Sequence, residues 1–250
     1  MFAIVQRPSV QRIVVACLVL GTAACGFRAP GSSTPLATSL RELVPHGDRD
    51  HFVYVVERPT DRGFQPDGFQ VEHVSKLTTA GEFEVTLSED GMATGRVQIR
   101  DDGTTIWVLS EEDYTRGVRL AYDPPLPYLQ VPLFAGAHRS TSSVKMIQLA
   151  NGQPAGTMQV TQVVEASAAP PGQWRSGVHG GGVQLRTART LQSPDGDLEL
   201  TTTMVLVPGM GEIRSEGQVS GAPALRRQLA CAIIGSHAIG DCTNLLQRKK

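Results

Sequence analysis

Short Asp-Gly and Asn-Gly turns recur between segments of alternating polarity, and this pattern limits the fold more than any other feature of the sequence. The turns are Asp67-Gly68, Asp90-Gly91, Asp102-Gly103, Asn151-Gly152 and Asp195-Gly196. Two-residue hairpin turns need positive φ, which Gly adopts freely and Asn or Asp at low cost. Between the turns, apolar residues such as Phe83, Val85 and Leu87 alternate with polar ones, as in a strand with one buried face. We therefore predict about ten antiparallel strands between Phe52 and Glu216, joined mostly by hairpins.

Three other segments depart from this alternation. Residues 39–46 are predicted to form a short helix before the first strand. The four prolines of 123–132 exclude an inner strand, so this segment is predicted to be a crossover that divides the sheet into two parts. Residues 166–177, rich in Ala, Pro and Gly, are predicted to form a second loop.

The C-terminal region has the spacing of a helix. Pro223 can occupy the first helical position, Leu225, Leu229 and Ile233 would share one face, and Gly235 would end the helix. The predicted fold class is therefore mainly β, with about ten strands and a short C-terminal helix. The strands would form a curved antiparallel sheet, which could be a half-barrel or a sandwich.

The first 24 residues have the composition of an export signal. Arg7 and Arg12 precede an apolar run that begins at Ile13, and small residues follow it up to Ala24. A positive start, a short apolar run and a small-residue end predict a secretory signal peptide. The run is well below the roughly 20 residues of a membrane-spanning helix.

The stretch Leu20-Gly21-Thr22-Ala23-Ala24-Cys25 resembles the lipobox of bacterial lipoproteins. In that family a cysteine receives a diacylglyceryl group and becomes the new N-terminus. The resemblance implies that residues 1–24 are removed and that acyl chains such as palmitate on Cys25 anchor the protein in a membrane. The alternative is an ordinary signal peptide cut after Ala24, with Cys25 as a free thiol.

The segment after Cys25 is predicted to be a flexible tether. Residues 26–38 hold two Pro, two Gly and several Ser and Thr, a composition typical of linkers. The expected organisation is a signal peptide (1–24), a tether (25–38) and one β-rich domain (39–250), with two sub-sheets divided at 123–132. Because Gly26 and not Asp follows the cysteine, the familiar sorting rule predicts the periplasmic side of the outer membrane in a Gram-negative host. In a Gram-positive host the anchor would lie in the outer leaflet of the cell membrane.

The remaining cysteines follow from the predicted export. Cys17 lies in the removed segment, which leaves Cys231 and Cys242 in the mature domain. A pair of cysteines in an oxidising compartment predicts a disulfide. The alternatives are two free thiols or half of a zinc site that includes His237.

Several short stretches resemble a β-rich periplasmic family of unknown function, called TapB-like. They are Leu126-Pro127, Leu133-Phe134-Ala135-Gly136, the hairpin from Gly156 to Glu165, and Val207-Pro208-Gly209-Met210-Gly211-Glu212-Ile213-Arg214. The similarity covers residues 126–216. It implies an antiparallel, strongly curved sheet and no established chemistry.

Two glycine-rich stretches invite a catalytic or nucleotide-binding interpretation. His179-Gly180-Gly181-Gly182 is similar to the oxyanion-hole loop of some esterases, but the sequence has no G-x-S-x-G nucleophile elbow. We predict a flexible loop before a strand. Gly209-Met210-Gly211 lacks the third glycine of a nucleotide fingerprint, so we predict a turn between strands.

Charged and metal-ligating residues give no stronger signal. His46, His51 and His73 follow no ligand spacing and are predicted to lie on the surface. The acidic run 111–113 lacks the alternating ligands of a calcium loop and is predicted to be a solvated loop. Residues 226–227 and 248–250 are basic and would solvate the helix and tail or contact anionic lipid. We predict no catalytic residue, no metal and no cofactor.

Composition narrows the possible partners. The formal net charge is -1 and apolar residues make up 40% of the chain, so a real core can form and nucleic acid is not an expected partner. Trp107 and Phe134 are expected in the core, whereas Trp174 is expected in a loop, where it could line the mouth of a pocket.

We therefore expect a lipid-anchored envelope protein that acts as a binding or structural protein and not as an enzyme. Its partners would be the membrane, through Cys25, and a hydrophobic ligand or an envelope protein. One alternative is a carrier of lipid or lipoprotein with a concave apolar face. Another is a hydrolase with an unrecognised Ser or Cys nucleophile beside a histidine such as His179. A third is a scaffold without a ligand, which predicts a filled sheet interior and an exposed apolar patch.

Overall fold

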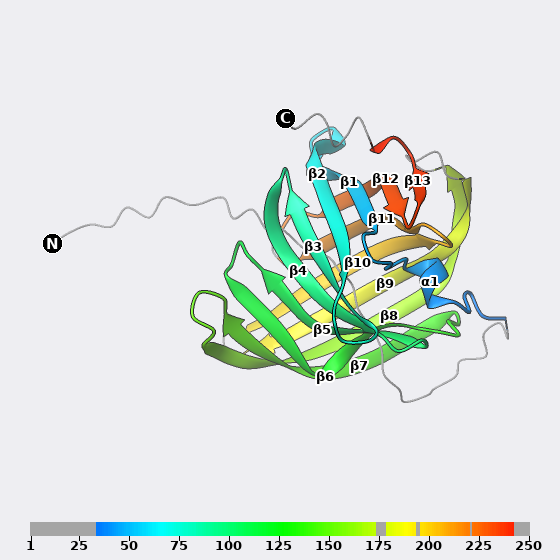
Figure 1. Ribbon diagram of the computed structural model, residues 1–250. Helices are drawn as coiled ribbons and strands as arrows, with labels where there is room; N and C mark the ends of the chain where they lie inside the picture. Colours follow the sequence, from blue (N-terminus) through cyan, green and yellow to red (C-terminus); the bar gives the residue numbers. More distant parts are fainter. Residues whose placement is uncertain (1–33, 174–178, 194–195, 221, 243–250) are drawn as a thin grey trace.

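The computed structural model describes residues 34–173, 179–193, 196–220 and 222–242, which form one antiparallel sheet (Figure 1). The strands are β1 (His51–Thr60), β2 (Gly63–Lys76), β3 (Glu82–Glu89), β4 (Met92–Asp101), β5 (Thr105–Asp113), β6 (Val118–Gln130), β7 (Gly136–Gln148), β8 (Pro154–Gln173), β9 (His179–Ser193), β10 (Gly196–Val207), β11 (Gly211–Val219), β12 (Leu225–Ile234) and β13 (His237–Ile239). Each strand pairs with the next in the chain, and β12 also pairs with β1. The first twelve strands therefore close into a barrel. Strand β13 lies antiparallel beside the end of β12 and pairs with it over three residue pairs.

The closed barrel corrects the predicted fold class. Alternating polarity identifies strands and their buried face, and the class is indeed mainly β. The alternation of polarity carries no information about whether the first and last strands pair with each other. Here they meet along seven residue pairs, from His51↔Ile233 to Glu57↔Arg226, so the sheet is neither a half-barrel nor a sandwich. Closure gives β1 a partner on both sides and removes an exposed sheet edge.

The predicted C-terminal helix was wrong, because this segment is the closing strand β12. Leu225 and Leu229 are four residues apart, and a spacing of four fits both a helical turn and two steps of a strand. The strand repeat becomes visible only when Arg227 is counted as an inward residue. Burial alternates from Leu225 to Cys231, with Arg227 among the buried positions.

The proline-rich segment was also predicted wrongly. Residues 118–130 form one strand, and the strands before and after 123–132 belong to the same sheet. Pairing between β6 and β7 ends at Asp123↔Ser143, and beyond this point β6 pairs only with β5 through an irregular ladder. Pro124, Pro125 and Pro127 thus lie where β6 has a free side, which is where a residue without an N–H is tolerated.

The predicted loop at 166–177 is strand β8 as far as Gln173, and residues 174–177 lie outside the described residues. Strand β8 pairs with β9 over most of its length. The Ala-rich composition reflects small inward side chains such as Ala166, which is 4% exposed.

One predicted two-residue hairpin turn is confirmed, and two others lie in longer connections between strands. Asp90-Gly91 joins β3 and β4, with φ of 47° and 81°, as a type I′ turn requires. Asp102-Gly103 and Asn151-Gly152 also lie between strands. Asp67-Gly68 does not, because it lies inside β2 beside a register shift between β1 and β2. Positive-φ glycines serve bulges as well as turns. Asp195 lies outside the described residues.

The chain before β1 crosses one end of the barrel. The backbone of Leu36 bonds to Leu133, and the Glu42 carbonyl accepts a hydrogen bond from the N–H of Gly209 in the β10–β11 turn. Between these contacts lies α1 (Leu40–Leu43), within the predicted 39–46, and both of its leucines are buried in the core. The segment therefore closes this end with apolar side chains.

Candidate functional site

A buried ionic cluster lies inside the barrel around Arg227 of β12. Its guanidinium donates two hydrogen bonds of 2.7 Å to the two carboxylate oxygens of Glu212, from Nε and Nη2. Nη1 donates to Glu72 at 2.5 Å and to the side-chain oxygen of Gln70 at 2.7 Å. The guanidinium also lies 4.4 Å from the ring centre of Tyr54. One side chain thus connects strands β11, β12, β1 and β2 at the seam where the barrel closes.

This cluster carries two carboxylates against one guanidinium. Burial raises the pKa of the Glu72 carboxyl, Arg227 opposes the shift, and Glu212 adds to it. Burial alone would lower the pKa of Arg227, but the two carboxylates hold it well above its usual value. Because an uncompensated buried charge is unfavourable, ionising Glu72 costs more in this cluster than in water, which is what its raised pKa expresses.

The Glu212–Arg227 pair lies where the backbone pairing between β11 and β12 is short. Strands β11 and β12 share only four residue pairs, from Arg214↔Gln228 to Gly217↔Leu225. Arg227 lies within that ladder, opposite Ser215, and its forked bond reaches Glu212, two residues beyond the last pair on β11. The side chains therefore continue a connection that the backbone leaves short.

The cavity beside this cluster is small. It has a volume of about 50 Å³, and its polar lining side chains are His46, Tyr54, Glu72, Tyr128, Glu212 and Arg227. Sites for organic ligands usually measure about 300–1,000 Å³. The cavity can hold a few water molecules and is too small for an acyl chain.

A second buried cluster surrounds Arg189 of β9. Its guanidinium donates hydrogen bonds to Glu111 (3.1 Å), Gln162 (3.2 Å) and the hydroxyl of Tyr122 (3.2 Å). Burial raises the pKa of the Tyr122 phenol above its ordinary value, so the hydroxyl stays protonated. Within the part of the chain that the structure describes, this cluster pairs one cation, Arg189, with one anion, Glu111.

The acidic run 111–113 is part of strand β5 up to Asp113 and not a solvated loop. Glu111 reaches Arg189, whereas Glu112 forms a forked pair with Arg96 at 2.7 and 2.8 Å. Asp113 accepts hydrogen bonds from the backbone and hydroxyl of Thr115. The three carboxylates have separate partners and do not form one cation site.

The basic pair 226–227 also divides between the two faces of a strand. Arg227 points inward, whereas Arg226 bonds to Glu216 at 2.9 Å and lies over the ring of Phe64. This pair is therefore not a basic surface patch on a helix. Residues 248–250 lie outside the described residues.

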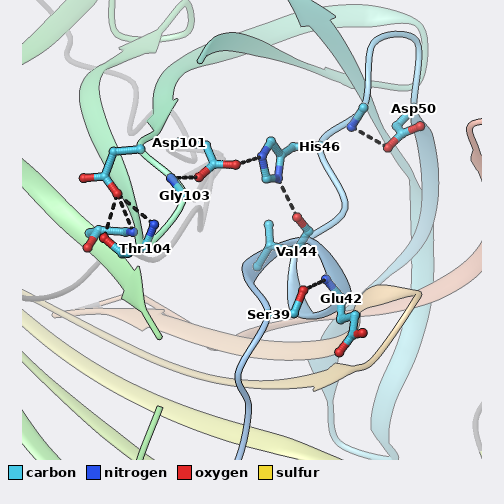
Figure 2. Close-up of polar contacts among 11 residues, drawn as sticks. Ser39, Glu42, Val44, His46, Asp50, Asp101, Gly103 and Thr104 are labelled. Carbon is cyan, nitrogen blue, oxygen red and sulfur yellow. Dashed lines mark hydrogen bonds and ion pairs between the residues drawn. The ribbon is translucent and has the colours of Figure 1, made fainter. Parts of the chain in front are cut away.

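His46 is buried at the end of the barrel that α1 crosses, and Figure 2 shows its contacts. Nδ1 lies 2.6 Å from the carbonyl oxygen of Val44, and Nε2 lies 2.9 Å from Oδ2 of Asp101. A carbonyl only accepts, so Nδ1 carries a proton. The other oxygen of Asp101 accepts from the N–H of Gly103 at 2.7 Å. This arrangement ties the chain before β1 to the β4–β5 turn.

The three histidines considered as metal ligands do not meet. His46 is buried and not on the surface, while His51 and His73 pair with each other on β1 and β2, with ring centres 5.8 Å apart. Among the described residues no group of three His, Cys, Asp or Glu side chains is arranged to hold a metal ion.

Cys231 and Cys242 are joined by a disulfide, with their Cα atoms 5.4 Å apart. Both lie with Val53 in a small apolar cluster separate from the main core. The bond attaches the chain after β13 to the barrel wall. Cys25 and the predicted signal peptide lie outside the described residues.

The glycine-rich stretch at 179–182 belongs to β9 and is not a loop. A Cβ on Gly182 would lie 2.2 Å from the carbonyl oxygen of Leu206, so glycine is required by close strand packing. The side chain of His179 and all of Trp174 lie outside the described part of the chain. The stretch around Gly209 is the β10–β11 turn, as predicted.

The predicted core aromatics are not buried. Trp107 and Phe134 are both of intermediate exposure, and the Trp107 indole N–H donates to Asp102 at 2.7 Å. Its neighbours Ile106 and Val108 are fully buried instead. No helix within the described residues is long and apolar enough to cross a membrane.

Sequence comparison gives the chain no family: neither a family model nor a curated protein matches it. The similarity of residues 126–216 to TapB-like proteins therefore has no support from these comparisons. Two solved structures resemble the fold. One is a Bacteroides fragilis protein with a YmcC-like fold, inferred to be exported. It has a TM-score of 0.47 and 12% identity and covers 78% of this chain and 98% of its own.

The second is a Parabacteroides distasonis protein inferred to be a lipoprotein. Its TM-score is 0.48 and its identity 10%, and the match covers 81% of this chain and 99% of that one. Both likenesses are too weak to transfer a family or a function.

Proposed function

We propose that this chain is an exported cell-envelope lipoprotein, anchored through acyl chains on Cys25, that acts as a binding or structural protein and not as an enzyme. The observation that carries the proposal is the lipobox-like stretch ending at Cys25, with a linker-like segment after it. The described fold begins at Thr34. Nine residues span at most about 30 Å when extended, so the tether would keep the barrel close to the membrane and raise its effective concentration there.

The filled interior of the barrel supports the proposal that this protein binds partners on its outer surface. A carrier of lipid requires a continuous apolar cavity, whereas the interior described here contains the ionic clusters of Arg227 and Arg189. The cavity beside Arg227 measures only about 50 Å³. These features argue for a filled barrel that binds on its outside, and against the carrier.

The described residues also give little support to the hydrolase. Both described cysteines are in the disulfide. The buried histidine, His46, contacts a carbonyl and a carboxylate and no nucleophile. A hydrolase would need a serine beside a histidine in an accessible pocket.

Mass spectrometry of the full chain expressed in a bacterial host tests the anchor. We expect a mature protein that begins at Cys25 and carries the mass of a diacylglyceryl group, recovered with membranes. Cys25→Ala should lack the lipid and leave the membrane fraction. Cys17→Ala is the matched control, because that cysteine lies in the removed segment and its loss should not change the mature mass. A wild-type protein that starts at residue 25 without lipid would refute the anchor.

A further inference from the structure

The outer wall of the barrel carries a groove that follows β10. It has a volume of about 460 Å³, within the range of ligand sites. Its floor is formed by the short side chains Thr201, Thr203 and Val205 of β10. Its walls are formed by longer side chains on the two neighbouring strands, namely Gln184 and Arg186 on β9 and Arg214, Glu216 and Gln218 on β11.

The strand register builds this groove. Thr203 pairs with Arg186 on one side and with Glu216 on the other, and Val205 pairs with Arg214. Residues paired in this way project from the same face of a sheet. A row of small residues between two rows of long ones therefore becomes a channel one strand wide.

The two arginines of the walls are weakly engaged. Among the described residues, the nearest carboxylate oxygen to Arg186 belongs to Glu165, and the nearest to Arg214 belongs to Glu216, both at 3.8 Å. The arginine side chains are 67% and 40% exposed, and such pairs contribute little in water. Glu216 is already paired with Arg226, at 2.9 and 3.1 Å. An anion that enters the groove would therefore have to displace only weak ion pairs to reach the guanidiniums of Arg186 and Arg214.

The dimensions of the groove select an extended occupant. Neighbouring strands are about 4.8 Å apart, so β9 and β11 lie about 9–10 Å apart across β10. A helix with its side chains is about 10–12 Å wide and does not fit between the walls. The floor residues repeat every two positions, about 6.6 Å, which is also the repeat of side chains on one face of an extended peptide.

We propose that the groove over β10 binds an extended acidic peptide segment of another envelope protein. A carboxylate of the peptide lies between Arg186 and Arg214 and accepts a hydrogen bond from the hydroxyl of Thr203, which has no partner among the described residues. The inference rests on the proposed binding role but not on the lipid anchor. Acylation and groove binding can therefore fail separately.

Fluorescence anisotropy with labelled octapeptides tests the proposal on the full chain in detergent. The acidic probe alternates Glu and Thr, and the matched probes carry Gln or Lys in place of Glu. We expect the acidic peptide to bind about tenfold more tightly than the Gln peptide, as expected for two charge-assisted hydrogen bonds. The Lys peptide should not bind, and the difference should shrink as salt is added.

Variants assign the binding to the groove. The double variant Arg186→Gln/Arg214→Gln should lose the tenfold preference, and Thr203→Val should weaken binding of the acidic peptide. Arg116→Gln is the matched control, because Arg116 is 50% exposed with a carboxylate at 3.6 Å and lies in the β5–β6 turn, away from the groove. All four residues are on the outside, and thermal melting checks that the variants fold.

Three outcomes would overturn the proposal. The first is equal affinity for the acidic and Gln peptides. The second is equal binding by Arg186→Gln/Arg214→Gln and Arg116→Gln. The third is binding of inorganic phosphate or of phosphatidylglycerol vesicles that depends on the two arginines while the acidic peptide fails, which would assign the groove to phosphate instead. Repeating the titration with Cys25→Ala separates these results from the anchor, because that variant keeps the groove.

Discussion

Replacing Glu72 by Gln should stabilise the protein at neutral pH, although Glu72 is hydrogen-bonded inside the barrel. The substitution keeps the shape of the side chain and an oxygen that can accept from Nη1 of Arg227. It leaves the forked pair between Arg227 and Glu212 intact. It changes the cluster from two carboxylates and one guanidinium to one of each.

The magnitude follows from two opposing contributions. Loss of a buried, poorly compensated carboxylate removes a desolvation cost of several kcal/mol. Weakening its charge-assisted hydrogen bond to Arg227 costs about 1.5–3 kcal/mol. The expected net gain is on the order of 1 kcal/mol, which for a domain of this size raises Tm by about 2–4 °C.

The effect should depend on pH with a definite sign. Burial raises the pKa of Glu72 in the folded protein above the ordinary 4.5, so the folded state holds a proton that the unfolded state has released. Stability therefore falls as pH rises from 4.5 through the folded-state pKa. Glu72→Gln removes that fall, so its advantage is absent below pH 4.5 and largest at neutral pH and above.

Thermal melting of the wild type and the variant across this pH range provides the measurement. Glu212→Gln is the contrasting variant, because it breaks the forked pair and should cost about 1–3 kcal/mol. If Glu72→Gln lowers Tm at neutral pH as much as Glu212→Gln does, and by the same amount at every pH, then Glu72 is ionised and fully compensated. The electrostatic reasoning would then be refuted.

Three further perturbations test other parts of the structure. Cys231→Ser opens the link to Cys242 and should cost about 3 kcal/mol, with a reductant lowering the Tm of the wild type but not of the variant. Gly182→Ala should cost about 1–3 kcal/mol because its Cβ would overlap a backbone oxygen of β10. Gly181→Ala, whose nearest atom is 3.7 Å away, should melt like the wild type. Arg189→Gln leaves the carboxylate of Glu111 without its cationic partner and should lower the free energy of unfolding in urea by about 2–4 kcal/mol. A change below about 0.5 kcal/mol, the size of an ordinary surface substitution, would contradict the structural role of Arg189.

Local features could be predicted from the sequence because local physics sets them. The turn at Asp90-Gly91 follows from the few residues that accept positive φ. The strand at Phe83–Leu87 follows from alternation, and the short helix predicted within 39–46 is α1, whose N-terminus is capped by the side chain of Ser39. In each case the residues that decide the outcome are neighbours in the chain.

Other features could not be predicted because a local pattern allowed two answers. Leu225 and Leu229 fit a helix and a strand equally well, and Arg227 looked like a solvent-facing residue until the barrel enclosed it. Prolines at 124–127 exclude a strand segment that is paired on both sides. They do not exclude this part of β6, which pairs with β5 alone because its pairing with β7 ends at Asp123. The candidate groove gave no sequence signal, since Arg186, Thr203 and Arg214 are ordinary outward residues of three separate strands.

The sequence by itself determined that the chain is built of antiparallel strands joined by tight turns, since those depend on φ preferences and on the polarity of adjacent residues. Only the tertiary structure decided that β1 meets β12, which charges are enclosed and which side chains share the groove. Those outcomes depend on strand register and barrel closure, and both are set by contacts between residues far apart in the chain. A strand's own sequence says which side is apolar, but it does not say which neighbour it will have or what that neighbour will place opposite each residue.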